Sequence, residues 1–275
     1  MAASILTEPD SFHHLSIMVE EVLAALAPTP GGLYLDVTAG GAGHSAALLE
    51  REPGARLLAF DRDPIAVAAA RRRLAPFGER ARVVHGSFRD LARELERAGV
   101  DFVDGVLADL GVSSVQLDSP ERGMSFRHEG PLDMRMDTTQ GDTALDVISR
   151  LDASELADLI YTYGDEHRSR RIARCIRQAL EAGELSTTLD LRRAVVRAVG
   201  PRRVGGVDPA TRTFQALRIA VNEELAELEA LLALLPRIIR PGGVAALLSF
   251  HSLEDRLVKR AFLDRSAWVR LAKKP

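Results

Sequence analysis

The sequence predicts an α/β protein with a doubly wound, mainly parallel sheet, into which an all-helical domain is inserted. Short apolar runs alternate with helical patterns as far as Asp109. Such alternation is typical of a parallel sheet that is covered by helices on both faces. From about residue 118 to 208 no strand pattern is recognisable, and the sheet pattern then resumes.

Five apolar runs are expected to form the sheet, and they span 33–37, 56–60, 82–85, 103–108 and 244–250. A sixth strand is expected at 268–271. Apolar residues at helical spacing predict a first helix over 18–26. Further helices of the sheet domain are expected from about His44, over 65–74 with Pro64 in the first turn, over 210–235 and over 252–263.

The inserted region is expected to be entirely helical. Asp152 and Glu155 form a capping-box pair at the start of a helix that stops at Gly164. Two more helices are expected over about 166–182 and 188–199. The predicted division is therefore a sheet domain over 14–117, a helical substrate-recognition domain over 118–208, and the rest of the sheet domain over 209–275.

Composition is typical of a soluble globular protein, with 46% hydrophobic and 27% charged residues in 275. No apolar run approaches the ~20 residues that span a bilayer, and no signal peptide is recognisable. The single cysteine, Cys175, excludes an internal disulfide and a cysteine-rich metal site, and it is expected to be a small buried hydrophobe. These features favour a cytoplasmic protein without a membrane partner.

The net charge of −3 is unevenly distributed. The segment 166–215 holds 11 Arg and 5 acidic residues, a local net charge of +6. This asymmetry points to a polyanionic partner, although solvated helix faces are an equally good interpretation.

Polar and small residues follow the ends of the predicted strands, where doubly wound sheets bind ligands. A glycine-rich turn follows Asp36, and Asp61 ends the second strand, 18 residues after Gly43. An acid at that place can accept both ribose hydroxyls of an adenosine. The turn also fits the dinucleotide fingerprint, and a tight turn without a ligand is a further interpretation. Asp109 at the end of the fourth strand and the polar stretch 249–252 after the fifth favour S-adenosylmethionine (SAM) over a dinucleotide.

Several long and rare motifs occur in order along the chain. They are GGAGHS (40–45), FDRD (60–63), HGSF (85–88), DLGVSS (109–114), ERG (121–123), SFRH (125–128), PLDMRMD (131–137), RRIAR (170–174), PATRTFQALRI (209–219) and SFHSLEDR (249–256). On these motifs the chain resembles the bacterial 16S rRNA (cytosine-N4)-methyltransferases of the RsmH/MraW family over about residues 14–262.

The resemblance implies a class I SAM-dependent methyltransferase fold with an inserted helical domain. It implies N4-methylation of a cytidine in the decoding region of 16S rRNA, with the small ribosomal subunit as partner. The SAM contacts that it implies are Ala42, Gly43, His44, Asp61, Phe88, Asp109 and Gln116.

The chain departs from the family pattern in three places. Val115 stands where the family commonly has Pro, which makes the Gln116 contact less certain, and Asp208 stands where it commonly has His. The family usually continues past a Lys-Pro like the one at 274–275 into a basic tail, so a missing C-terminal tail is expected.

Holding the exocyclic amine of cytosine towards a sulfonium methyl is mostly a matter of positioning and electrostatics. Asp109 is the catalytic candidate for this role, although it could serve the cofactor alone. C5 methylation needs a cysteine nucleophile, and Cys175 lies away from every strand end. No metal-ligand spacing stands out, so no metal is expected.

Substrate contacts are expected from Ser113, Arg174, Arg212, Phe214 and His251. For His251 a structural role is an equally good interpretation, and for Phe126 and Phe214 a place in the core is favoured over stacking on a base. Phosphate contacts are expected from Arg168, Arg170, Arg171, Arg174, Arg177, Arg192, Arg193, Arg197, Arg202 and Arg203.

Two other functions remain open from sequence. One is a ribosome-assembly factor that binds SAM and RNA without turnover, and the other is a nicotinamide-dependent dehydrogenase. The sequence leaves both a monomer and a homodimer open.

Overall fold

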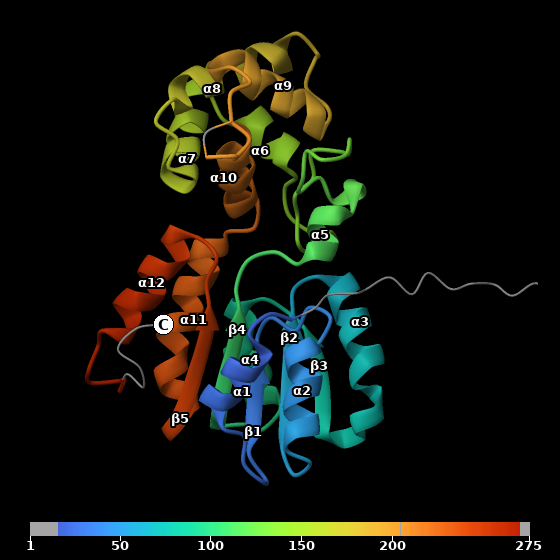
Figure 1. Ribbon diagram of the computed structural model, residues 1–275, viewed down its shortest axis with the longest axis vertical. Coiled ribbons are helices and arrows are strands. Elements are labelled where there is room, and N and C mark those ends of the chain that lie inside the picture. Colours follow the sequence, from blue (N-terminus) through green and yellow to red (C-terminus); the bar gives the residue numbers. More distant parts are fainter. Residues whose placement is uncertain (1–15, 204, 270–275) are drawn as a thin grey trace, which may run out of the picture.

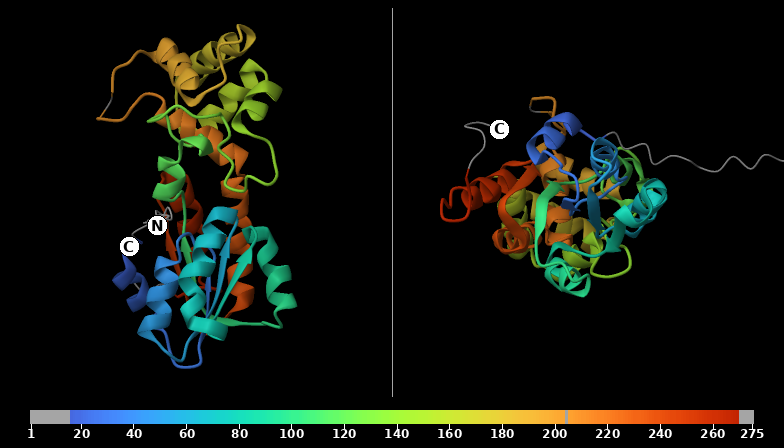
Figure 2. Two further views of the ribbon diagram at one scale, coloured as in Figure 1. Left: turned by 90° about the vertical axis from the view of Figure 1, so that its right-hand side faces the viewer. Right: turned by 90° about the horizontal axis from the view of Figure 1, so that it is seen from below.

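The computed structural model of the chain describes residues 16–203 and 205–269. Two units are stacked along the long axis, a sheet with its helices below and a helical unit above (Figure 1). The same stacking is visible after a quarter turn (Figure 2). Within the described residues, no helix combines the length and the apolar character that crossing a membrane requires.

The lower unit is built on a five-stranded parallel sheet with the order β3-β2-β1-β4-β5. Its strands are β1 (Leu33–Asp36), β2 (Arg56–Asp61), β3 (Ala81–His85), β4 (Val103–Asp109) and β5 (Ile239–Leu248). The order reverses direction between β1 and β4, which is the switch point where such sheets bind ligands. The predicted doubly wound, parallel sheet is confirmed.

Helices cover both faces of the sheet. Successive side chains of a strand point to opposite faces, so both sets of side chains are buried. Tyr34 and Leu57 pack against the helices of one face, and Leu35 and Leu58 pack against those of the other. The first face carries α1 (Val19–Leu26), α2 (Gly43–Arg51) and α3 (Pro64–Leu74). The second carries α4 (Leu91–Arg97), α11 (Glu224–Ile238) and α12 (Ser252–Phe262). Strands buried on both faces explain why their sequences read as continuous apolar runs.

The fifth strand begins earlier than predicted. It pairs with β4 at Val103–Ile239 and again at Gly105–Val244, so residues 240–243 bulge out opposite Asp104. Gly242 adopts a φ of 86° in this bulge, which a glycine reaches without strain. Residues 241–243 therefore form an irregularity inside the strand. The sixth strand is not formed at 268–269, and residues 270–271 lie outside the described part of the chain.

The upper unit has its own core. It is built from α6 (Ala144–Arg150), α7 (Ala153–Gly164), α8 (Ser169–Glu181), α9 (Thr188–Val199) and α10 (Thr211–Val221). The capping box of Asp152 and Glu155 is present as predicted. Phe126 and Phe214 meet edge to face with ring centroids 4.9 Å apart, and Cys175 is partly buried against the same core.

The single long helix expected over 210–235 is two helices. The chain turns at Asn222 and Glu223, where Glu223 adopts a left-handed φ of 48°. The reason is packing: Leu217 of α10 belongs to the helical core, whereas Leu228 of α11 belongs to the sheet core. Because each half has a continuous apolar stripe, the sequence pattern did not show the break. We propose that the helical domain extends to Asn222 rather than to 208.

Candidate functional site

A cavity that opens to solvent lies at the carboxyl ends of the strands. The loops that follow β1, β2, β3, β4 and β5 all contribute to its wall. Its lining includes five of the residues expected to bind the cofactor or to act in catalysis, namely His44, Asp61, Phe88, Asp109 and Gln116. Ser113, expected to contact the substrate, also lines it.

The glycine-rich loop after β1 is held by buried carboxylates. Asp36 accepts hydrogen bonds from Ser45 Oγ at 2.6 Å and from the Thr38 backbone N–H at 3.1 Å. Burial raises the pKa of Asp36. The Gly40 backbone N–H donates to Asp61 Oδ2 at 2.7 Å, which ties this loop to the end of β2. The loop is thus preorganised at the cavity wall.

Ala42 and Gly43 support this loop from behind. Ala42 is fully buried in a left-handed conformation, and it does not line the cavity. A Cβ on Gly43 would lie 2.1 Å from Ser16 Oγ, so the glycine is needed for the close approach of the chain before α1. Gly40 is the glycine of this loop that lines the cavity.

Asp61 faces the cavity with both carboxylate oxygens already accepting backbone hydrogen bonds, from Gly40 and from Asp63. Each oxygen of a carboxylate has a second acceptor position, so two hydroxyl groups of a ligand can still be bound. Burial raises the pKa of Asp61 to about 6 against these bonds. The group is therefore mostly ionised at neutral pH.

Asp109 ends β4 at the switch point. Its backbone N–H donates to Thr38 Oγ1 at 2.6 Å, and its Oδ2 lies 3.9 Å from His44 Nδ1. Its Oδ1 is buried without a hydrogen-bond partner among the described residues. Burial raises the pKa of Asp109 to about 6, although the charge of His44 opposes this. A buried acceptor without a partner is costly, and it indicates a place where a ligand donates a hydrogen bond.

His44 is the second residue of α2, and its Nε2 bonds with the Ile17 carbonyl oxygen at 2.8 Å. Phe88 begins the short 3-10 helix η2 (Phe88–Asp90) after β3. It lines the cavity at the β3 edge of the sheet, and β5 forms the other edge. Gln116 lies in α5 (Ser114–Asp118) and completes a capping box with Ser113. Its Nε2 donates to Asp63 Oδ2 at 2.8 Å.

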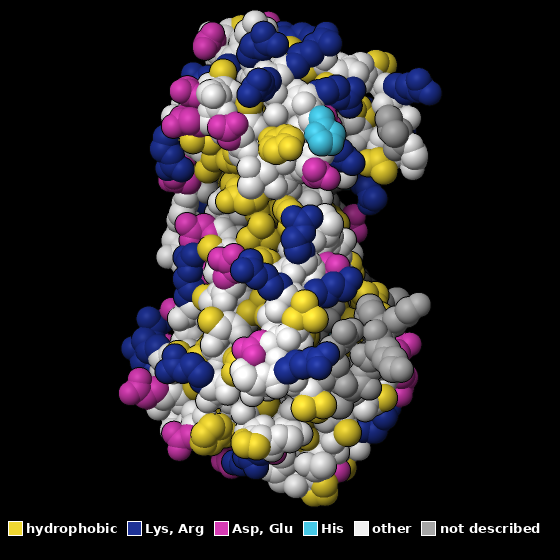
Figure 3. Space-filling view, turned by 90° about the vertical axis from the view of Figure 1, so that its left-hand side faces the viewer, with side chains coloured by type: hydrophobic (Ala, Val, Ile, Leu, Met, Phe, Trp, Pro, Cys, Tyr) yellow, Lys and Arg dark blue, Asp and Glu magenta, His cyan; other side chains and the backbone are white. Residues whose placement is uncertain are grey.

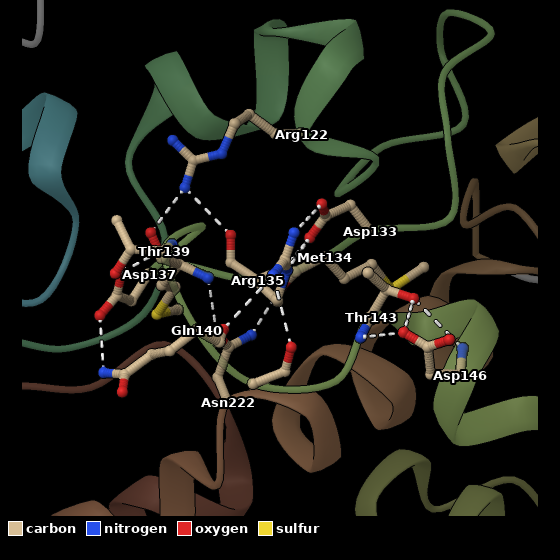
Figure 4. A network of polar contacts seen from close by, with 12 residues as sticks. Arg122, Asp133, Met134, Arg135, Asp137, Thr139, Gln140, Thr143, Asp146 and Asn222 are labelled. Atoms are coloured by element: carbon tan, nitrogen blue, oxygen red, sulfur yellow. Dashed lines mark hydrogen bonds and ion pairs between the residues drawn. The ribbon is translucent and has the colours of Figure 1, made fainter. Parts of the chain in front are cut away.

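Asp63 is also the partner of a buried arginine. Arg122 ends the 3-10 helix η3 (Pro120–Arg122), and its Nη1 lies 2.8 Å from Asp63 Oδ2. Its Nη2 donates to the carbonyl oxygens of Arg135 and Met136 at 3.0 and 2.8 Å (Figure 4). Those two residues belong to the segment 133–141, which we call the strap.

The strap is held from its other side by Asn222, at the break between α10 and α11. Asn222 Oδ1 accepts from the Met136 backbone N–H at 2.7 Å, and its Nδ2 donates to the Met134 carbonyl at 2.7 Å (Figure 4). Arg62 Nη1 in turn donates to the Asn222 carbonyl at 2.7 Å. Because Met136 lines the cavity, these contacts fix one part of its wall.

His251, expected to contact the substrate, caps α12. Its Nδ1 accepts from the Glu254 backbone N–H at 3.4 Å, and its Nε2 lies 3.2 Å from Glu254 Oε1. Burial alone would raise the pKa of Glu254, but His251, the Phe250 backbone N–H and Arg218 hold it below its usual range. His251 itself does not line the cavity, whereas Phe250 and Glu254 do.

Glu224, His251 and Glu254 bring ligand-type atoms within 4.8 Å of one another. Both oxygens of Glu224, however, already accept hydrogen bonds from Arg218, at 2.8 and 2.9 Å. Because His251 Nδ1 acts as an acceptor, Nε2 carries the proton of the neutral ring and has no free lone pair for a metal. We therefore assign no metal to this group.

The remaining substrate candidates lie in the helical unit. Arg174 is exposed on α8, and Arg212 Nη1 donates to the Asp165 carbonyl at 2.8 Å. Phe214 is buried against Phe126, as the sequence favoured, so we do not carry it into the proposed site. None of the three lines the cavity.

Lys and Arg side chains are spread over the helical unit at the top of the face shown in Figure 3. Six of the ten predicted phosphate contacts are engaged within the protein, namely Arg168 with Glu166, Arg174 with the Arg170 carbonyl, Arg177 with carbonyls at the end of α6, Arg192 with Asp208, Arg193 with Asp190 and Arg197 with the Cys175 carbonyl. The other four are exposed, and they are Arg170, Arg171, Arg202 and Arg203.

Sequence reasoning missed the contacts that shape the cavity over long distances in the chain. Arg122 lies in a motif used for the resemblance, but nothing local indicated Asp63 as its partner. The role of Met136 was also missed, because it depends on the fold of the strap. Phe250 was noted only as part of a polar stretch, although an aromatic residue directly after a strand end is a signal that could have been used.

Comparisons with known proteins agree with this architecture. The model of the MraW methylase family matches residues 11–274. The chain is 64% identical over 267 residues to a protein of Sorangium cellulosum named Ribosomal RNA small subunit methyltransferase H, covering 97% of this chain and 84% of that one. A protein of the same name from Geotalea uraniireducens is 50% identical, covering 91% and 81%.

Among solved structures, a SAM-dependent methyltransferase from Thiobacillus denitrificans in complex with S-adenosyl-L-homocysteine is 18% identical to the chain. The match has a TM-score of 0.29 and covers 34% of this chain and 36% of that one. This likeness is too slight to bear on the site.

Proposed function

Since the chain belongs to the MraW methylase family, we propose that it transfers the methyl group of SAM to ribosomal RNA of the small subunit. The proposed acceptor is the exocyclic N4 of a cytidine in the decoding region of 16S rRNA. The observation that carries the proposal is the Asp109 carboxylate, which lines the cavity at the switch point of the sheet and whose Oδ1 has no hydrogen-bond partner among the described residues.

The residues around the cavity fit SAM. Asp61 is placed to accept the ribose hydroxyls, and the Gly40 loop offers backbone close to the methionine part. Phe88 and Leu228 also line the cavity, and they are the proposed apolar contacts of the adenine ring. His44, Asp109 and Gln116 complete the proposed contacts, and Ala42 and Gly43 act through the shape of the loop.

SAM supplies an electrophilic methyl group on its sulfonium sulfur. The N4 lone pair of cytosine is delocalised into the ring, so the amine needs an acceptor that holds its N–H bonds in line for attack. The Asp109 carboxylate is the proposed acceptor, and it is mostly ionised at neutral pH because burial raises its pKa only to about 6. A carboxylate with this pKa can also take the proton that the amine loses when the N–C bond forms.

RNA binding is proposed for the helical unit. The exposed arginines Arg170, Arg171, Arg174, Arg202 and Arg203 can contact phosphates without breaking an existing contact with a carboxylate among the described residues. Ser113 at the cavity rim is the proposed polar neighbour of the base. A base of the RNA must leave its stack to reach a cavity of this kind.

The test is methyl transfer from labelled SAM to small ribosomal subunits that lack the modification, followed by nucleoside analysis. N4-methylcytidine at one position is expected, and Asp109→Asn is expected to lose at least about 100-fold in turnover, by analogy with the removal of one preorganised polar group. SAM binding without any transfer by the unchanged protein would instead support an assembly factor. Transfer to another atom would reject the N4 assignment.

A further inference from the structure

Phe250 is an exposed aromatic residue on the wall of the cavity. It lies two residues after the end of β5, and 58% of its surface is exposed although it lines the cavity. Its backbone is nevertheless held, because its N–H donates to Glu254 Oε2 at 3.1 Å and Glu254 is buried. A large apolar ring that is fixed in place and left uncovered inside a cavity indicates a ligand surface.

The ring lies beside the loop that follows Asp109. A Cβ added to Gly111 would come within 3.2 Å of Phe250 Cδ2, so the ring rests against the glycine backbone. The Leu110 backbone N–H donates to the Leu248 carbonyl at 3.0 Å, which joins the carboxyl ends of β4 and β5. Phe250 and Asp109 thus both line the cavity, at the ends of two neighbouring strands.

Two phenyl rings occur among the described residues that line the cavity, and they lie at its two ends. Phe88 follows the edge strand β3, and Phe250 follows the opposite edge strand β5. Asp61, the proposed ribose acceptor, ends β2 next to β3, which places the adenine beside Phe88. The ring after β5 is therefore left for a second planar group, on the far side of the methyl donor.

We propose that Phe250 is the platform on which the target cytosine stacks, so that its exocyclic amine reaches the Asp109 carboxylate. This inference rests on the proposed function and adds the residue that orients the base. An unstacked base loses its neighbours in the RNA, and an aromatic side chain replaces that contact. The loop 110–114 after Asp109 contains no aromatic residue of its own, so the neighbouring strand has to supply it.

The first test compares Phe250→Ala, Phe250→Tyr and the control Phe102→Ala. Phe102 is exposed to a similar degree, 51%, but it precedes β4, at the amino ends of the strands, and it does not line the cavity. For Phe250→Ala we expect kcat/KM with small subunits to fall by roughly 5- to 150-fold, the range found when stacking side chains are truncated. SAM affinity is expected to stay within about twofold, and Phe250→Tyr is expected to restore transfer.

Equal kcat/KM for Phe250→Ala and Phe102→Ala would overturn the inference while leaving the proposed function intact, provided that the unchanged protein transfers methyl groups. A parallel loss of SAM affinity and transfer in Phe250→Ala would also overturn it, because the ring would then serve the cofactor. Failure of the unchanged protein to methylate the subunits would reject the proposed function itself.

A second test reads the stacking directly. In Phe250→Trp combined with Trp268→Phe, the only indole of the chain stands at the proposed platform. Phenylalanine at 268 keeps an aromatic ring against Phe262, whose ring packs on Trp268. The indole fluorescence of this variant is measured with S-adenosylhomocysteine present. Unmodified subunits are expected to quench it more than subunits that carry another base at the target position. Equal quenching by both subunits, with binding confirmed by sedimentation, would overturn the inference.

Discussion

Replacing Arg122 by methionine removes the guanidinium group that joins the strap to Asp63, two residues after the end of β2. Arg122 Nη1 lies 2.8 Å from Asp63 Oδ2, and its Nη2 donates to two strap carbonyls. The side chains of Arg122 and Asp63 are 5% and 3% exposed. Methionine has a similar reach without the charge, so the Asp63 carboxylate would stay buried with only Gln116 and the Ile65 backbone N–H as partners.

Removing one partner of a buried ion pair costs about 3–5 kcal/mol, because the other charge is left without compensation. An exposed pair contributes about 0–1 kcal/mol. The matched control is Arg150→Met, since Arg150 pairs with Asp142 at the surface with side chains 63% and 50% exposed. We therefore expect Arg122→Met to lower the unfolding free energy by about 3 kcal/mol more than Arg150→Met does.

Urea unfolding followed by circular dichroism measures this difference, and amide exchange locates it. The Met134 backbone N–H donates to the Arg122 carbonyl and the Met136 N–H to Asn222 Oδ1, so both amides are expected to exchange faster in Arg122→Met. Asp63→Asn added to Arg122→Met is expected to recover part of the loss, because it removes the uncompensated charge. The reasoning is refuted if Arg122→Met and Arg150→Met are equally stable.

Two further predictions concern the ribose acid and the helical core. SAM affinity, measured by calorimetry, is expected to fall as the pH drops through about 6, where Asp61 takes up a proton. Asp61→Asn should weaken this dependence and leave the part that comes from Asp109, whose pKa is also raised to about 6; a pH profile parallel to that of the unchanged protein would contradict the assignment. The same raised pKa means that the folded protein binds this proton more tightly than the unfolded chain does, so the group's contribution to the unfolding free energy decreases as the pH rises from about 4 to about 6. Gly164→Ala is expected to destabilise the protein by about 1–3 kcal/mol, because a Cβ there would lie 2.5 Å from the Arg212 carbonyl where α7 meets α10; an unchanged midpoint in urea would show that the helices can separate at little cost.

The strand ends could be predicted from sequence because the signals are local. Asp36, Asp61 and Asp109 each follow an apolar run, and parallel strands bring their carboxyl ends to one edge. The break at Asn222 could not be predicted, because both halves of that segment are amphipathic and only packing assigns them to different cores. The contacts of Arg122 and Asn222 were out of reach for a similar reason, since the bonds of Asn222 to the strap join residues 86 and 88 positions apart.

The place of the insertion explains why the helical unit and the cavity belong together. The chain leaves the sheet after Asp109 at the carboxyl end of β4 and returns through α11 to β5, the neighbouring strand. Both connections therefore pass the switch point. The segment after β4 contributes Ser113 and Gln116 to the cavity wall, and the segment that leads into α11 and β5 contributes Glu224 and Glu227. The fold thus places a basic helical surface above the proposed methyl acceptor site while Asp109 itself stays fixed in the sheet.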